Sequence, residues 1–97
     1  MRIEELSQRA KDILVEASQS EDGMVYLTSF LGNTFLAANH RSFGDGTSMS
    51  NSENMLAIDE LLSYGFVTYE TESSSRRGYK LAASGYIAAK ELAYAVH

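Results

Sequence analysis

Residues 61–92 read LLSYGFVTYETESSSRRGYKLAASGYIAAKEL, and this stretch decides the fold. An apolar helix end at Leu61-Leu62 is followed by Gly65, which suits the left-handed position that stops a helix. Segments 66–72 and 79–82 are predicted strands, and the polar residues 73–78 between them predict a turn. A last helix is expected from about Ser84 to Val96.

The helix before this stretch begins in polar sequence. Ser50-Asn51-Ser52-Glu53 fits a capping box, in which a hydroxyl is followed three residues later by a glutamate. The helix that it opens is expected to bury four apolar residues, which are Met55, Ile58, Leu61 and Leu62. Residues 40–51 are predicted to form a loop, because Gly and Ser are frequent there.

The first half of the chain combines a helix with a hairpin. Apolar residues three or four positions apart predict a helix over 8–19 with Ser7 as its N-cap, or one that starts near Ile3. Segments 24–30 and 34–39 favour strands, and Leu31-Gly32-Asn33 favours a tight turn between them. The alternative is a second short helix through residues 36–38.

The order of elements in the second half resembles the back end of a winged helix-turn-helix domain. Leu61–Val67 is similar to the family's helix end, glycine and strand start. Residues 79–92 resemble its pattern Tyr-x-Leu-Thr-x-x-Gly followed by an amphipathic helix, with Ala82 in place of the threonine and Ser84 as the substitute cap. Ser7-x-x-Ala10-Lys11-x-Ile13-Leu14 matches the first helix of small bacterial winged-helix modules, a subset of which carries a β-hairpin next.

The resemblance implies an α+β fold. We expect residues 1–97 to form a single winged helix-like domain with three helices, a β-hairpin and a two-stranded wing. Winged helices serve as DNA-binding domains and also as dimerisation or protein-docking platforms, so the fold alone does not choose a function.

Composition narrows the choice of partners. Eight Lys and Arg stand against 13 Asp and Glu, a net charge of −5, so the domain has no general attraction for nucleic acid or anionic lipid. Without cysteine there is no disulfide or thiolate metal site. No signal peptide is visible, and no apolar run approaches the roughly 20 residues that cross a bilayer. We therefore expect a cytoplasmic protein with no membrane partner.

The charges of the helix before the predicted wing disfavour binding to DNA. It carries Glu53, Asp59 and Glu60 and no Lys or Arg, so it would repel phosphates. The alternative, a DNA-binding transcriptional regulator, would use the wing and the helix near residues 51–64. Its contact residues would be Arg41, Asn51, Asn54, Arg76, Arg77 and Lys80. The simpler interpretation is that the two asparagines cap and solvate the helix start and the wing arginines pair with Glu70 and Glu72.

No pattern points to catalysis. Ser42, His40 and Asp45 are residue types that serve as nucleophile, base and acid, but a Gly-rich loop gives them no fixed geometry. His40 and His97 are the only imidazoles, so the composition predicts no metal site. We expect no enzyme activity, no cofactor, no metal and no small-molecule substrate.

The last helix offers a protein interface. Tyr86, Ile87, Tyr94 and Val96 make it apolar nearly all round, so it either packs on a second subunit or closes the domain's own core. The sequence therefore favours a non-enzymatic interaction or regulatory module that acts through protein–protein contacts or homodimerisation.

Overall fold

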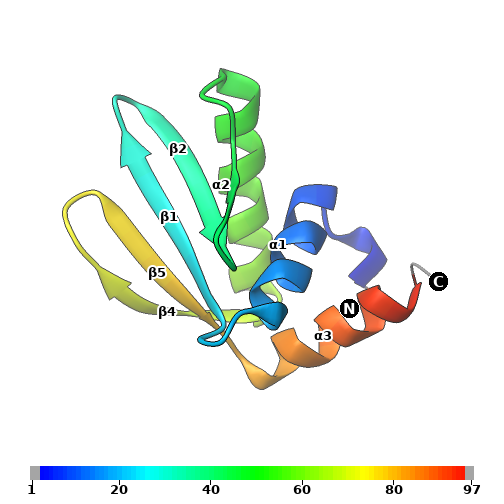
Figure 1. Ribbon diagram of the computed structural model, residues 1–97. Coiled ribbons are helices and arrows are strands. Elements are labelled where there is room, and N and C mark those ends of the chain that lie inside the picture. The colour runs from blue at the N-terminus through cyan, green and yellow to red at the C-terminus, as the bar shows by residue number, and fades with distance from the viewer. Residues whose placement is uncertain (1–2, 96–97) are drawn as a thin grey trace.

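The computed structural model describes residues 3–95 and shows an α+β fold (Figure 1). The three α-helices and five strands follow a short 3₁₀ turn at Ile3–Glu5. Their bounds are α1 Gln8–Gln19, β1 Met24–Phe30, β2 Asn33–Ala38, β3 Arg41–Phe43, α2 Ser48–Ser63, β4 Val67–Glu72, β5 Arg76–Leu81 and α3 Ala83–Ala95.

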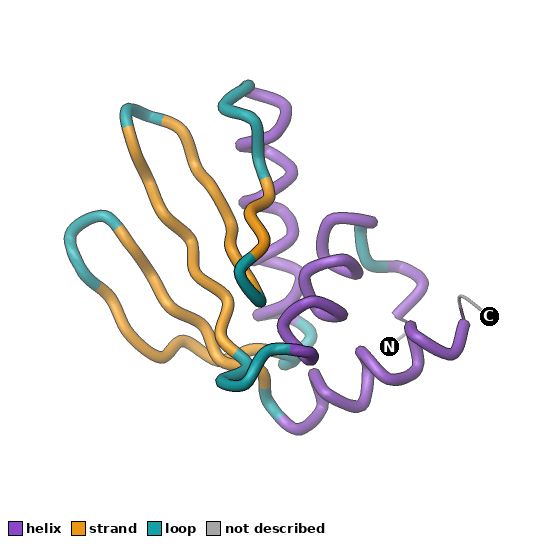
Figure 2. The backbone as a smooth tube through the Cα atoms, viewed as in Figure 1, coloured by secondary structure: helices purple, strands orange, loops and turns teal. Residues whose placement is uncertain are grey.

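All five strands form one antiparallel sheet in the order β3-β2-β1-β5-β4. The helices lie on one side of it: α2 packs along β2, and α1 lies between α2 and α3 (Figures 1 and 2). Strand residues that face the helices are buried, as the alternation at Val25, Leu27 and Leu36 shows. The opposite face of the sheet has no layer above it among residues 3–95.

Helix α1 confirms the bounds predicted from the sequence. Ser7 is its N-cap, and the Ser7 side chain accepts the Ala10 N–H. The buried stripe comprises Ala10, Ile13, Leu14 and Ala17, which are spaced as a 3.6-residue period requires.

The predicted hairpin is also confirmed, and the short helix through residues 36–38 is wrong. Phe30 pairs with Asn33, so only Leu31 and Gly32 form the turn. Both have positive φ, 52° and 82°, which is the type I′ geometry that matches strand twist.

The predicted loop over residues 40–51 is wrong, because it contains β3 and the start of α2. Asp45 organises the entry to the helix: its carboxylate accepts the Thr47 N–H and hydroxyl at 3.0 and 2.7 Å. Thr47, held in this way, is the N-cap and accepts the Ser50 N–H. The capping box at Ser50 is therefore wrong, and Ser50 is instead buried, where its Oγ accepts the Asp45 N–H.

Helix α2 is rotated relative to the expectation. Ile58 and Leu61 are buried as predicted, but Met55 and Leu62 are exposed. The buried stripe runs through Ser50, Asn54, Ala57, Ile58 and Leu61. Because Ser50 and Asn54 are polar, the spacing of apolar residues in the sequence does not reveal this stripe. The predicted stop is confirmed, since Gly65 has φ 75° and its N–H donates to Leu62 O while Phe66 N–H donates to Leu61 O.

The second hairpin is longer than predicted. Strand β5 begins at Arg76, because residues 76–78 continue the ladder with β1 and β4 rather than forming a turn. The expected separate hairpin and two-stranded wing are thus joined through β1 and β5 into one sheet. Helix α3 begins at Ala83, one residue before the expected start, and the Ser84 hydroxyl donates to Gly65 O, so Ser84 is not its cap.

Candidate functional site

The open face of the sheet presents side chains of mixed chemistry. The register places Met24, Tyr26 and Thr28 of β1 on this face, with Phe35 and Ala37 of β2 on one side. Arg76 and Lys80 of β5 lie on the other side, opposite Thr28 and Met24. All seven are exposed or half-buried, whereas their neighbours in the sequence on the helix side are mostly buried.

Arg76 and Tyr26 form the best-defined contact on this face. The Arg76 guanidinium carbon lies 3.8 Å from the Tyr26 ring centroid, which is a cation–π contact. Gly78 pairs with Tyr26 across the strands, and a Cβ at Gly78 would lie 3.2 Å from Tyr26 Cε1 and 2.6 Å from Thr71 Cγ2. Glycine at position 78 therefore lets the tyrosine ring lie close to the sheet.

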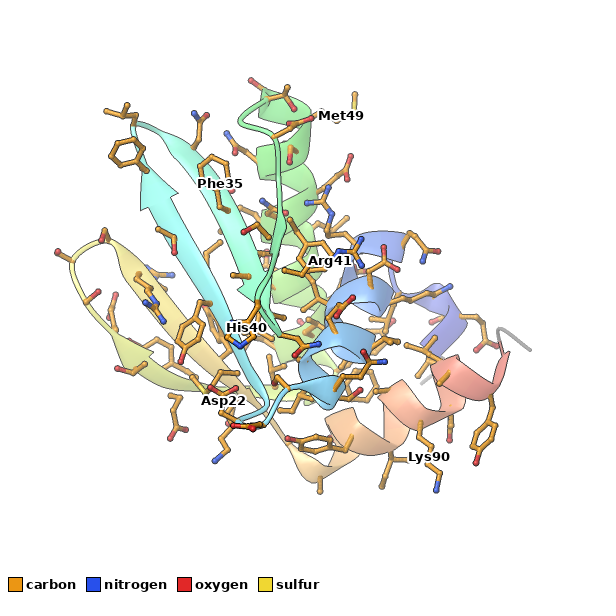
Figure 3. The ribbon with its side chains drawn as sticks, viewed as in Figure 1. Asp22, Phe35, His40, Arg41, Met49 and Lys90 are labelled. Carbon is orange, nitrogen blue, oxygen red and sulfur yellow. The ribbon has the colours of Figure 1, made fainter. Side chains whose placement is uncertain are left out.

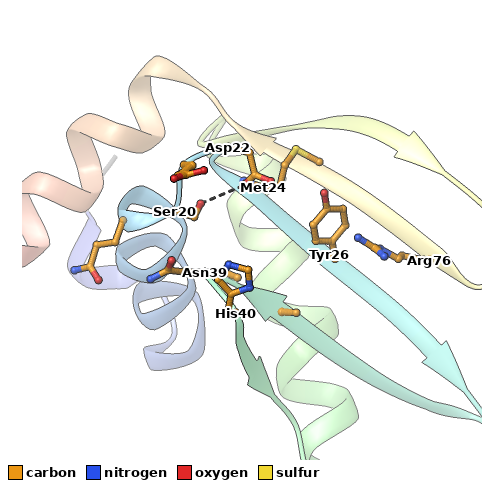
Figure 4. A pocket seen from close by; sticks show the side chains of 11 residues that line it. Ser20, Asp22, Met24, Tyr26, Asn39, His40 and Arg76 are labelled. Atoms are coloured by element: carbon orange, nitrogen blue, oxygen red, sulfur yellow. Dashed lines mark hydrogen bonds between the residues drawn. The ribbon is translucent and has the colours of Figure 1, made fainter.

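A cleft of about 680 Å³ opens beside this pair (Figure 4). Met24 and Tyr26 line it from β1, and Asn39 and His40 line it from the turn between β2 and β3. Residues 19–22 close one end, where the Ser20 hydroxyl donates to Asp22 Oδ1 at 3.3 Å, and Arg76 stands at the other end. The cleft therefore has carboxylates at one end and a guanidinium at the other.

The basic residues named from the sequence do not gather on one surface. Arg41 binds Glu16 of α1 at 2.9 Å on the helix side, and Arg77 pairs with Glu72 at 3.4 Å. Arg76 and Arg77 point to opposite faces because they are adjacent in a strand. Only Arg76 and Lys80 share the open face.

The Arg41–Glu16 pair has an electrostatic consequence. Its hydrogen bond, followed by the one from Asn39, holds the pKa of the Glu16 carboxyl below its usual value. Figure 3 shows Arg41 over α1 rather than on the open face of the sheet. Arg41 therefore ties β3 to the first helix.

Asn51 and Asn54 are engaged inside the fold. Asn54 is fully buried: its Nδ2 donates to Thr34 O at 2.9 Å and Phe43 O at 3.4 Å, and its Oδ1 accepts from Arg9. Asn51 Oδ1 accepts the Thr34 N–H at 2.9 Å. The use of Asn54 as a base-reading residue is therefore wrong, because the side chain has no access to solvent.

Two of the α2 acids also serve the fold. Both Glu60 carboxylate oxygens accept the Ser7 N–H at 3.2 Å, so Glu60 helps to cap α1. Glu53 pairs with Arg9 at 3.0 Å, while Asp59 is exposed. The acids are thus partly neutralised, but no positive surface replaces them on α2 itself.

The β4–β5 hairpin is held by interactions at its surface. The Tyr69 ring packs edge-on against Tyr79, and its hydroxyl donates to Glu72 Oε1 at 2.8 Å. That hydrogen bond is the main reason the pKa of Tyr69 is raised. Of the two arginines expected to pair with Glu70 and Glu72, Arg77 pairs with Glu72, whereas Arg76 forms no salt bridge within residues 3–95.

Helix α3 exposes part of the predicted interface. Ile87 and Tyr94 are 62% and 70% exposed, whereas Ala88, Ala89 and Leu92 are buried in the core. Tyr86 is 40% exposed, and its hydroxyl packs against Gly23, where an added Cβ would lie only 2.2 Å from the hydroxyl oxygen. Val96 lies outside the described residues.

His40, Ser42 and Asp45 are not joined by hydrogen bonds in the described part of the chain. His40 lies at the cleft, Ser42 lies on β3, and Asp45 binds Thr47, whose two hydrogen bonds lower the Asp45 pKa. Within residues 3–95, no three His, Asp or Glu side chains are grouped as metal ligands.

The sequence reasoning missed Tyr26 as a site residue. One signal was present: segment 24–30 is apolar at Met24, Tyr26 and Phe30 as well as at Val25 and Leu27, so both faces of this strand are apolar. An apolar face that the helices do not cover is a candidate binding surface.

No α-helix of the described residues is long and apolar enough to cross a membrane. No family model, curated protein or solved structure matches the chain.

Proposed function

We propose that this chain is a non-enzymatic, winged helix-like interaction or regulatory module that works by homodimerisation through α3. The winged-helix part of the proposal rests on the order of elements. Helix α2 leads through Gly65 into the β4–β5 hairpin, and α3 follows directly. The fold differs from a winged helix-turn-helix domain in one respect. Three strands, and no second helix, separate α1 from α2, so the fold has no compact helix-turn-helix.

The arrangement of exposed apolar and charged side chains on α3 is the main observation that supports the proposal. Ile87 and Tyr94 are seven residues apart, so they lie on one stripe two turns apart. Lys90 and Glu91 lie at the midpoint between them, and both are exposed. Figure 3 shows Lys90 projecting from α3 on the side away from α1.

This stripe is complementary to itself. If two copies of α3 pack antiparallel about a two-fold axis between residues 90 and 91, Ile87 of each copy meets Tyr94 of the other. Lys90 of each copy then meets the opposite Glu91. The apolar contacts supply affinity, and the charge pairs set orientation and register.

The competing DNA-binding function has weaker support. Arg41 and Arg77 are held by carboxylates, and Asn54 is buried. Arg76 and Lys80 alone offer two phosphate contacts, which is few for a duplex-binding domain. The site geometry therefore favours a protein partner over a nucleic acid.

A charge-swap series measured by sedimentation equilibrium tests the dimer. Lys90→Glu or Glu91→Lys alone places like charges opposite each other twice in the dimer, and we expect each to weaken association about tenfold. The double variant Lys90→Glu/Glu91→Lys is expected to restore it. Ile87→Asp is expected to abolish association, and Lys11→Glu, on α1, serves as the control.

Two results would contradict the proposal. One is a strict monomer for the unmodified chain at high concentration. The other is a double variant that associates no better than the single variants. Salt-sensitive binding to a DNA duplex that is lost in Arg76→Ala/Arg77→Ala would support the competing regulator instead.

A further inference from the structure

The cleft on the open face owes its shape to two small residues beside Tyr26. Tyr26 pairs with Gly78 on one side and Ala37 on the other. The ring lies close over Gly78, which has no side chain to hold it off the sheet. Ala37 lines the cleft on the other side, where its methyl group leaves the space over β2 unfilled.

The wall across this space comes from the tight turn after β2. Asn39 and His40 both have positive φ, 52° and 63°, and they form the two-residue link between the paired residues Ala38 and Arg41. His40 lines the cleft from this turn while Tyr26 lines it from β1 (Figure 4). The volume of about 680 Å³ lies within the range of about 300–1,000 Å³ that holds small ligands.

Charge determines which ligand fits. Within residues 3–95, Arg76 forms no salt bridge, because Glu72 of the facing strand pairs with Arg77 instead. Its guanidinium is held against Tyr26 and keeps N–H donors available for an anion. Glu21 and Asp22 at the opposite end repel a second anion and can accept N–H donors.

We propose that this cleft binds a small flat-ring anion, meaning an aromatic ring that carries one carboxylate or phosphate group. The ring lies over Ala37 between Tyr26 and His40, and the anionic group accepts hydrogen bonds from Arg76. Apolar contact with Tyr26 and Ala37 supplies affinity, and Arg76 sets the orientation. Such a ligand departs from the sequence-based expectation of no small-molecule partner.

Titration of the full chain, followed by its amide NMR signals, tests the proposal. Adenosine monophosphate probes the phosphate source of the anion, and indole-3-acetate probes the carboxylate source. Neutral adenosine and cationic tryptamine are the matched comparison compounds. We expect at least one anion to shift the Tyr26, Ala37 and His40 signals, and its uncharged or cationic counterpart to bind at least tenfold more weakly.

Three variants locate the site. Arg76→Gln is expected to weaken binding of the anion about tenfold, the effect of one charge-assisted hydrogen bond. Arg77→Gln makes the same charge change one residue away on the opposite face and is expected to leave binding unchanged. Ala37→Leu fills the space over β2 and is expected to remove binding while the amide spectrum stays folded.

The proposal is overturned by any of three results. The first is no shift at Tyr26, Ala37 and His40 with either anion at about 5 mM, where a site with a Kd near 1 mM is mostly filled. The second is equal weakening by Arg76→Gln and Arg77→Gln. The third is undiminished binding by a folded Ala37→Leu protein.

Discussion

The two edges of the sheet differ in how their backbone groups are protected. At the β3 edge the strand is short and ends at Phe43, which pairs with Leu36. At the β4 edge the strand is longer, and all of its residues after Val67 are exposed. An unprotected edge invites pairing with another chain, so each edge needs a means of preventing it.

The β3 edge is completed by side chains of α2. Thr34 lies beyond the end of β3, and its N–H and C=O would otherwise lack partners on that side. Asn51 accepts the Thr34 N–H, and Asn54 donates to the Thr34 C=O. Two amides one helical turn apart thus take the place of a strand and also fix α2 against β2.

The β4 edge is protected by charge and irregularity. Glu70 and Glu72 lie on this strand, and the register shifts between Tyr69 and Thr71. A bulge and like charges both oppose pairing with a second copy. One edge is thus covered by buried polar groups of α2, while the other is left in water, where its charges and bulge oppose pairing with a second chain.

Asn54→Leu gives the largest expected effect on this contrast. The leucine removes three hydrogen bonds and leaves Thr34 O, Phe43 O and the Arg9 guanidinium without their buried partner. We expect a loss of about 3 kcal/mol in the free energy of unfolding, measured by urea denaturation.

Thr68→Val on β4 is the control, because it also replaces a polar side chain with an apolar one. Thr68 is exposed, so the expected change is within about 0.5 kcal/mol. A loss below about 1 kcal/mol for Asn54→Leu would show that the amides do not hold this edge.

The contrast also explains how far the sequence could predict the fold. Helix α1, the first hairpin and the stop at Gly65 follow from local signals: a hydroxyl cap, a two-residue turn and a glycine at positive φ. Strand β3 does not, because a three-residue strand is too short to show a period. The rotation of α2 was not predictable either, because Ser50 and Asn54 are polar residues that hydrogen bonds allow to be buried. Ser50 binds Asp45, five residues away, and Asn54 binds Thr34, 20 residues away.

The candidate site was less predictable still. Arg76 was visible as a basic residue, but its contact with Tyr26 depends on the pairing of β1 with β5, which are about fifty residues apart. The small residues Gly78 and Ala37 that shape the cleft carry no chemical signal of their own. A site defined by strand register can be found only when the register is known.

Arg41→Gln tests the β3 edge through its pH dependence, with a smaller expected effect. The pKa of folded Glu16 is below its ordinary value of 4.5, so the Arg41 pair stabilises the fold above that pH. This stability is lost as the pH falls through the lowered folded value. We expect Arg41→Gln to reduce the fall in urea midpoint on acidification below pH 4.5, with Arg76→Gln, which has no carboxylate partner in the described chain, as the unchanged control. Parallel acid profiles for wild type and Arg41→Gln would contradict this account.

Glu72→Gln is expected to give the smallest effect, because it acts at the exposed edge. The change removes the charge partner of Arg77, but both side chains are about half exposed, and exposed ion pairs contribute little. The glutamine can still accept the Tyr69 hydroxyl, so the expected loss is below about 0.5 kcal/mol. The informative readout is association rather than stability, because removing one of the β4 charges lowers the barrier to edge pairing. Light scattering on heating is expected to rise earlier for Glu72→Gln than for Glu5→Gln, which makes the same change at an exposed position in the 3₁₀ turn before α1. Identical scattering curves for the two variants would mean that the bulge alone protects this edge.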